Sequence, residues 1–407
     1  MAGMVTGIRS RPEVGVGLLF STTGTYRTIG TAMLSGALLA IEEIAADASF
    51  DFKLAPVIEN PGGSVPYYYA CCETLLRRRG VSHVIGCYTS SSRKEVIPFF
   101  ERCDALLWYP SHYEGFECSD NVIYVGASPN QHIAPLAGYL MSAYGRRGYC
   151  VGSNYIWPWE STRIMRQILE ANGGTVVAER YLPLGVKDVK HIIDEIAELE
   201  PDFIYNSLIG ESCYAFIEAF SAASARRGSG GARLPIIGSC TLSEPELLAL
   251  RPEARGGHIS SSVYFQTIDS AENHRFIRRY RKRFGSSAVA SADAEASYVA
   301  VLLLAHAIRR AGSTGIEAVR SVAHEFTLEA PQGAVHVDSE NNHCHLTPRL
   351  GRSTEKGDFE ILYTADGPLR PDPYLVWFDP IRDTRNWSAI GHDRSYCQWI
   401  ETQEMHR

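Results

Sequence analysis

Short apolar runs alternate with longer segments of helical periodicity along this chain, and this alternation limits the possible folds more than any other feature. Val14–Phe20 is predicted to be a buried strand, and apolar residues spaced three and four apart from Leu34 to Ala45 predict an amphipathic helix. Strands that alternate with helices of this length indicate βαβ units and a parallel sheet. Further strands of the first half are expected at 54–59, 81–86 and 105–109, with helices at 67–78 and 92–102.

The same pattern begins again near residue 121, which predicts a second unit of the same kind. Its strands are expected at 121–126, 149–152, 176–181, 203–207 and 235–239, with helices at 130–144, 160–172, 189–199 and 214–223. After Gly257 the pattern predicts a strand at 258–264, helices at 271–284, 292–311 and 316–325, and a β-rich tail. The predicted fold class is α/β, with two doubly wound parallel-sheet lobes and a ligand cleft between them.

The domain boundaries are assigned on this pattern. We place residues 14–127 and 258–335 in the first lobe and residues 128–257 and 336–390 in the second, and we expect residues 1–13 and 391–407 to be flexible termini. At about 150 residues per domain, 407 residues suffice for two or three domains that each bury a core.

The composition narrows the class of function. With a net charge of −7, the chain has no overall positive field that would draw it to nucleic acid. No apolar run approaches the roughly 18 residues of a membrane-spanning helix, and residues 1–11 lack the apolar core of a secretory signal. The ten cysteines show neither a disulfide framework nor zinc-binding spacing. We therefore expect a cytoplasmic protein that contacts neither a membrane nor nucleic acid directly.

The loops that follow the predicted strands are the best place to look for function, because open parallel sheets bind ligands beyond the carboxyl ends of their strands. These loops carry hydroxyl and aromatic side chains, which suit a neutral polar ligand with both a C=O and an NH2 group. A charged ligand would instead require Glu211, Glu244, Arg93 or Lys94. A serine run before a helix can also be a simple N-cap, and aromatic residues after strands can be packing. The loops are Ser21–Gly24, Cys87–Ser92, Pro110–Tyr113, Ser153–Trp157, Leu208–Glu211 and Cys240–Thr241.

Signatures of catalysis are missing from the sequence. It contains no phosphate-binding loop, no GxSxG, no HExxH and no complete GxGxxG. His343 and His345 would share a face of an extended strand, as a metal pair requires, but no distant partner is evident and turn contacts explain them as well. Cys87, Cys118 and Cys240 could be nucleophiles, although buried structural thiols are the more common case. No motif therefore indicates a catalytic site, and we expect no metal or cofactor.

Several ordered motifs give the chain a resemblance to a known family. Those in the strand-end loops include Gly86–Lys94 (GCYTSSSRK), Tyr109–Glu117 (YPSHYEGFE) and Gly152–Ser161 (GSNYIWPWES). Together they resemble the amide-sensing negative regulators of the aliphatic amidase operon (AmiC type), within the type I periplasmic-binding fold that also includes branched-chain amino acid, urea and amide-binding proteins. The resemblance covers about residues 14–374. The other motifs that carry it are 16–24, 36–43, 126–131, 330–335, 341–343 and 370–374.

The resemblance implies a cytoplasmic, non-catalytic sensor whose two lobes close on a small aliphatic amide. In its amide-free form such a protein silences an RNA-binding antitermination regulator, and the amide releases this partner; a homo-oligomer is also expected. Ser90 would hydrogen-bond the amide, and Tyr155 with Ser111 would orient it. The remaining ligand-binding residues implied by the matching motifs are Tyr88, Tyr109, Trp157, Ile209 and Thr241.

Departures from the family pattern mean that the chemical identity of the ligand is not determined by the resemblance. The family tends to have Thr at Ser111 and Tyr at Trp157, so the volume and polarity of the pocket differ here, and Glu211 is unexpected beside the cleft. The ligand could therefore be urea, an amide derived from a nitrile, or a related molecule. An alternative function is the substrate-binding component of an ABC uptake system for amides, urea or amino acids. A third hypothesis is an amidase or other hydrolase that uses Cys87 or Cys118.

Overall fold

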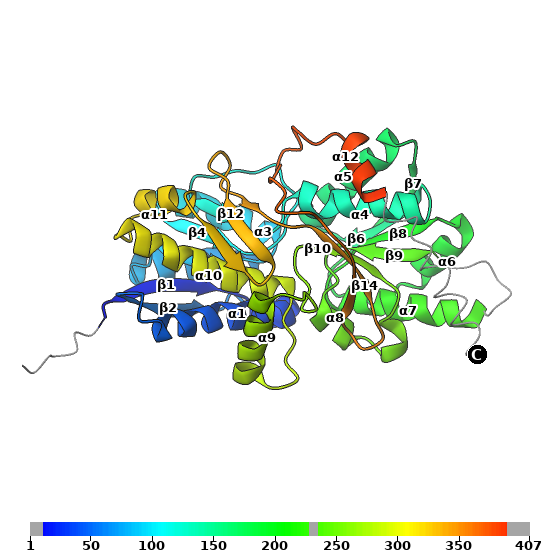
Figure 1. Cartoon of the computed structure of the whole chain (residues 1–407). Coiled ribbons are helices and arrows are strands. Elements are labelled where there is room, and N and C mark those ends of the chain that lie inside the picture. The colour runs from blue at the N-terminus through cyan, green and yellow to red at the C-terminus, as the bar shows by residue number, and fades with distance from the viewer. Residues whose placement is uncertain (1–10, 228–234, 389–407) are drawn as a thin grey trace, which may run out of the picture.

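Two sheets lie side by side in the computed structural model, which describes residues 11–227 and 235–388 (Figure 1). The first sheet has the strand order β2-β1-β3-β4-β5, and all its neighbouring strands are parallel. This arrangement confirms the α/β fold with parallel sheets. Its strands are β1 (Glu13–Leu19), β2 (Lys53–Glu59), β3 (His83–Gly86), β4 (Leu106–Tyr109) and β5 (Val122–Tyr124).

The second sheet has seven strands in the order β15-β14-β10-β9-β8-β6-β7. Its parallel strands are β6 (Arg147–Ser153), β7 (Thr175–Leu182), β8 (Phe203–Ser207), β9 (Ile236–Ser239) and β10 (Ile259–Ser262). The hairpin of β14 (Arg349–Ser353) and β15 (Phe359–Thr364) is added antiparallel to β10 at one edge. A small third sheet joins β11 (Thr327–Ala330), β12 (Gly333–Val337) and β13 (Cys344–His345).

Helices cover these sheets, and most of them follow a strand as expected. In the first half they are α1 (Arg27–Ala46), α2 (Val65–Glu73) with the π-helical turn η2 (Thr74–Arg78), and α3 (Ser90–Cys103). In the second half they are α4 (Pro129–Ala143), α5 (Ile156–Ala171), α6 (Lys190–Leu199), α7 (Glu211–Arg227) and the short α8 (Glu244–Ala249). The remaining helices are α9 (Ala271–Phe284), α10 (Ala292–Ala311), α11 (Ile316–Ala323) and α12 (Arg382–Ser388), with the 3-10 turns η1 (Gly24–Tyr26) and η4 (Pro252–Ala254).

Strand pairing corrects two of the predicted boundaries between the lobes. β10 falls in the segment assigned to the first lobe, but it pairs with β9 and β14 in the second sheet, so the chain crosses between sheets after β10 rather than at residue 258. β13 falls in the segment assigned to the second lobe, but it pairs with β12. An isolated strand has the same apolar pattern in either sheet, so periodicity alone could not place these two. The predicted flexible termini lie outside the described residues except for residues 11–13, where Glu13 begins β1.

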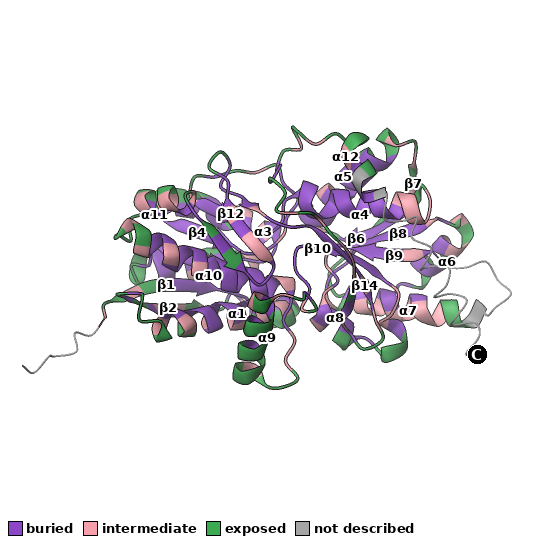
Figure 2. Ribbon diagram, in the orientation of Figure 1, coloured by how far each residue is buried: buried purple, intermediate pink, exposed green. Residues whose placement is uncertain are grey.

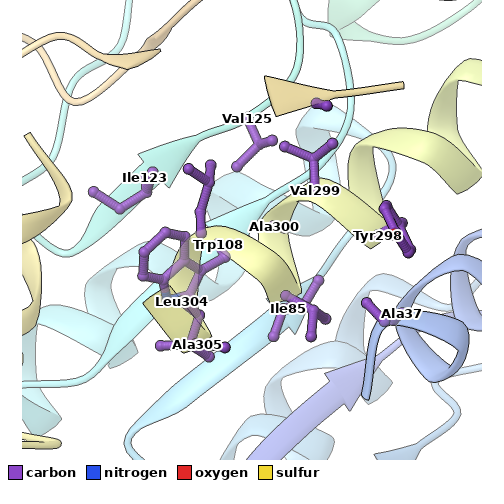
Figure 3. Close-up of a cluster of buried hydrophobic side chains, with 14 of the residues drawn as sticks. Ala37, Ile85, Trp108, Ile123, Val125, Tyr298, Val299, Ala300, Leu304 and Ala305 are labelled. Carbon is purple, nitrogen blue, oxygen red and sulfur yellow. The ribbon is translucent and has the colours of Figure 1, made fainter. Parts of the chain in front are cut away.

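The core of the first lobe forms where α1 and α10 pack on the sheet, and Figure 3 shows part of this cluster around Trp108. The two helices approach closely because Gly36 has no side chain: a Cβ there would lie 1.9 Å from the carbonyl oxygen of Ala294. In Figure 2, buried residues follow both sheets and the inner faces of α10 and α4. This tight packing fixes the start of α10, which lies beside the site described below.

One helical segment departs from an expectation about hydropathy. The 23-residue stretch Gly24–Ala46 contains an 18-residue window with mean hydropathy 1.5, and by length and composition alone it could cross a membrane. Half of this apolar stretch is buried inside the protein, where α1 packs against α10. Its apolar character is accounted for by its position in the core of the first lobe.

Candidate functional site

A small cavity lies where loops of the two lobes meet. It has a volume of about 10 Å3, enough for the centre of one water molecule. The loops that follow β3 and β4 line it from the first lobe, and those that follow β6 and β9 line it from the second. Six of the eight residues implied by the resemblance line this cavity, together with Thr89 and His112; the six are Tyr88, Ser90, Ser111, Tyr155, Trp157 and Thr241.

The serine run after β3 forms both an N-cap and a wall of the cavity. Thr89 is the N-cap of α3, and its hydroxyl accepts a hydrogen bond from the backbone N–H of Ser92 at 3.2 Å. The Ser92 hydroxyl donates to the carbonyl of Thr89 at 2.8 Å, so Ser92 also serves the cap. Ser90, at the first position of α3, lines the cavity instead, and its hydroxyl donates to the Glu114 carboxylate. The interpretation as an N-cap therefore applies to Thr89 and Ser92, and the interpretation as a ligand-binding loop applies to Ser90.

Tyr109 and Ile209 do not line this cavity. The Tyr109 hydroxyl donates to the backbone carbonyl of Tyr88 at 2.7 Å and so supports the cavity wall from behind. Ile209 lines a second interlobe pocket of about 270 Å3, which lies between the segment Thr23–Ile29 and the start of α7. Glu211 lines this second pocket, is exposed, and pairs with Lys187 at 2.7 Å.

A buried charge cluster behind Ser90 was not assigned a role from the sequence. The Arg93 guanidinium lies between the rings of Tyr109 and Tyr113, 4.7 and 4.6 Å from their centroids. It donates to Glu114 at 3.1 Å and to Glu117 at 2.6 Å, and Arg93 is fully buried. The cluster holds the Glu114 carboxylate in the position where it accepts the hydrogen bond from the Ser90 hydroxyl. Arg93 and Lys94, considered above as partners for a charged ligand, are engaged with these carboxylates instead.

Asp293 and Glu114 are two residues of the site that sequence reasoning missed. Asp293 lies in the first turn of α10, and its carboxylate accepts a hydrogen bond from the Ser111 hydroxyl at 3.3 Å. The two residues are 182 positions apart, and no local pattern links them. Burial raises the pKa of Asp293 to about 6, so the ionised form still dominates near neutral pH. Glu114 stands within the motif 109–117, yet nothing in that motif alone indicated its contact with Ser90.

The other candidate chemistries find little support among the described residues. Burial raises the pKa of the Cys87 thiol to about 12, and it raises that of Cys240 as well, so neither thiol ionises readily near neutral pH. His343 stacks on Tyr124 at 4.0 Å and hydrogen-bonds Tyr113, whereas His345 pairs with Asp338 at 3.1 Å. Within the part of the chain that the structure describes, no three His, Cys, Asp or Glu side chains gather as a metal site would require.

The fold and much of the sequence are similar to those of known proteins. A family model described as "Periplasmic binding protein domain" matches residues 14–380. An ABC transporter solute-binding protein of Rhodopseudomonas palustris HaA2, solved with p-hydroxybenzoic acid, superposes with a TM-score of 0.78 and 18% identity, covering 89% of this chain and 99% of that one. The substrate-binding protein LivJ of Streptococcus pneumoniae, solved with isoleucine, gives a TM-score of 0.75 and 18% identity, covering 88% and 100%.

Curated proteins match at somewhat higher identity over less of the chain. The Leu/Ile/Val-binding protein homolog 6 of Brucella abortus (strain 2308) is 23% identical over 305 residues, which is 73% of this chain and 76% of that protein. Limonene hydroxylase of Geobacillus stearothermophilus is 29% identical over 134 residues, 33% of this chain. That match spans only 24% of the hydroxylase, so it carries no inference about activity. At these identities the solved structures establish the fold alone.

Proposed function

Because this chain belongs to the periplasmic binding protein domain family, we propose that it is a ligand-binding protein whose interlobe cavity takes a small uncharged amide. The lining of the cavity carries the proposal: hydroxyl, phenol and indole groups from both lobes surround it. Burial lowers the pKa of His112 to about 4, so this imidazole is neutral near pH 7. Because no cation lines the cavity among the residues that the structure describes, a carboxylate ligand would lack an opposite charge there.

A small amide has a few non-hydrogen atoms, more than the single water that the cavity admits in this structure, so in this proposal the loops of the two lobes move apart to take it. At most about 1.5 kcal/mol of binding free energy is available per such atom, so a ligand of about four to six atoms gains at most about 6–9 kcal/mol. This gain corresponds to dissociation constants in the micromolar range. Such an affinity suits a metabolite that is present at micromolar to millimolar levels.

We further propose that closure of the lobes on the amide is a regulatory signal. A ligand shifts the balance between open and closed lobes only by its difference in affinity for the two states. Because the cavity is walled by both lobes, an amide in it contacts both and favours the closed state. In this proposal the protein is a cytoplasmic negative regulator, and its partner is an RNA-binding antitermination protein that the amide releases. Co-purification of such a partner, lost on addition of acetamide, tests the proposal.

Uptake is the second candidate function, because the solved proteins of the same fold are solute-binding proteins of ABC transporters. A solute-binding protein for uptake would have the same fold and the same pocket as a sensor. Fractionation of native cells separates the two: recovery of the protein in the periplasm or at the cell surface would support uptake and contradict the sensor.

A thermal-shift panel of acetamide, urea, butyramide and benzamide tests the ligand class. Measurement of ammonia release from these compounds tests whether any of them is hydrolysed.

Replacing Ser90 by alanine is expected to weaken acetamide binding by about 1–3 kcal/mol, because it removes a buried hydrogen-bonding partner of the ligand. Isothermal titration calorimetry measures the change. Ser92→Ala is the matched control, since Ser92 is buried on the same turn but does not line the cavity. Equal affinities of the Ser90→Ala variant and the unmodified protein would mean that the ligand binds elsewhere.

A further inference from the structure

The direction of the hydrogen bond from Ser90 restricts what this residue can offer a ligand. A serine hydroxyl has one proton to donate and two lone pairs to accept with, whereas an ionised carboxylate only accepts. Glu114 forms a salt bridge with the buried Arg93 at 3.1 Å, so its oxygens are acceptors, and the Ser90 hydroxyl must donate its proton to them. Toward the cavity, Ser90 can then only accept.

Ser111 is constrained in the same way by a different carboxylate. Its hydroxyl donates to Asp293 at 3.3 Å, and near pH 7.5 Asp293 is mainly ionised because burial raises its pKa only to about 6. The proton of Ser111 is therefore also directed away from the cavity. Both cavity serines belong to the first lobe, and both present lone pairs to whatever lies between them.

Trp157 supplies the opposite polarity from the second lobe. An indole N–H can only donate, and Trp157 is 3% exposed and lines the same cavity. Its Nε1 is buried and has no hydrogen-bond partner among the residues that the structure describes, so it reaches a ligand only when the loops around the cavity move to admit one. A buried donor without a partner costs about 1–3 kcal/mol, which an acceptor on a ligand would recover.

We propose that the cavity is polarised to select a primary carboxamide, with Ser90 and Ser111 accepting from its NH2 group and Trp157 Nε1 donating to its carbonyl oxygen. Glu114 and Asp293 act as positioning residues, because each fixes the direction of one serine proton. This inference rests on the proposed function and deepens it.

The polarity explains how such a protein would distinguish an amide from the acid formed by its hydrolysis. Acetamide and acetate have nearly the same shape, but acetate replaces the NH2 group with a second acceptor oxygen that bears negative charge. That oxygen would face two serine oxygens that cannot donate to it, with two carboxylates directly behind them. The cavity therefore responds to the substrate of an amide-hydrolysing reaction and not to its carboxylate product.

Calorimetry at about pH 7.5 with acetamide, acetone and acetate tests the polarity, because the three have nearly the same shape. Acetone keeps the carbonyl and lacks the N–H groups without adding charge. We expect acetamide to bind at least about tenfold more tightly than either. Equal binding of acetone and acetamide would overturn the inference and leave the proposed function standing. If neither acetamide nor any other amide of the thermal-shift panel binds, the proposed function itself is wrong.

Two variants test the residues that set the polarity. Asp293→Asn places an N–H donor beside Ser111 and frees the serine proton for the cavity, so the preference for acetamide over acetate is expected to fall at least about tenfold. Glu295→Gln is the matched control, because Glu295 is buried on the same helix and bonds to Gln332 without lining the cavity. An unchanged preference in Asp293→Asn, or the same fall in both variants, would contradict the role of Asp293.

Trp157→Phe tests the donor side of the cavity. This change keeps an aromatic wall and removes the N–H, and we expect acetamide binding to weaken about tenfold. Because acetone presents the same carbonyl, any residual acetone binding should weaken by a similar factor. Full acetamide affinity in Trp157→Phe would show that the carbonyl oxygen takes its hydrogen bond from another group, and this would overturn the assignment of Trp157.

Discussion

Arg93→Met is expected to lower the free energy of unfolding by about 3–5 kcal/mol, measured by urea denaturation near pH 7.5. The change removes the buried cation that pairs with Glu114 and leaves Glu117 with Lys94 alone, and a buried carboxylate that loses its cation is costly. It also removes the stacking of the guanidinium between Tyr109 and Tyr113. Methionine fills much of the same space with an unbranched, flexible side chain, so the loss reports the charge more than the volume.

A surface arginine with similar partners provides the control for Arg93. Arg163 lies over the ring of Phe116 at 4.6 Å and pairs with Glu160 at 2.8 Å, but its side chain is 32% exposed. Arg163→Met is therefore expected to cost at most about 1 kcal/mol, as exposed ion pairs do. A loss in Arg93→Met no larger than that in Arg163→Met would show that the buried cluster is not needed for stability.

The Arg93 cluster also illustrates where prediction from the sequence succeeds and where it stops. The sequence places Arg93 after a strand and within a family motif, but it does not reveal that the guanidinium is buried between two rings. The contact of Ser111 with Asp293 joins residues 182 positions apart, and it exists only because the first turn of α10 lies beside the loop after β4. Contacts of this kind depend on tertiary packing, which local periodicity does not encode.

Local structure could be predicted much better, for identifiable physical reasons. The helices α9 and α10 have the predicted bounds, because each begins after a serine whose hydroxyl caps it, Ser270 and Ser291. β8 also has its predicted bounds, as a short apolar run between polar segments. β10 was placed in the wrong lobe because a strand of four residues carries no information about its neighbours. The six cavity residues were implied by the family resemblance, and they lie in the predicted strand-end loops, which meet because residues after parallel strands gather at one edge of a sheet.

Trp108→Ala is expected to cost about 3–5 kcal/mol of unfolding free energy, the range for removing a large aromatic side chain from a core. Trp108 is fully buried on β4, and its ring belongs to the same apolar cluster as Ile123 on the sheet and Leu304 and Ala305 on α10 (Figure 3). Alanine would leave a cavity between this strand and this helix. Because β4 ends at Tyr109 and leads directly to Ser111, we expect acetamide affinity to fall as well. Urea denaturation and calorimetry measure the two effects.

Trp108→Phe separates loss of volume from loss of the indole N–H. The Nε1 of Trp108 is buried and has no hydrogen-bond partner among the described residues, so removing it relieves an unsatisfied donor. Phenylalanine keeps one aromatic ring in the cluster, and its smaller volume costs part of what alanine costs. These two effects oppose each other, and we expect a net loss below about 1.5 kcal/mol. If phenylalanine destabilised the protein as much as alanine, the N–H would have to be satisfied by a buried water, and the core at Trp108 would be polar on one side rather than wholly apolar.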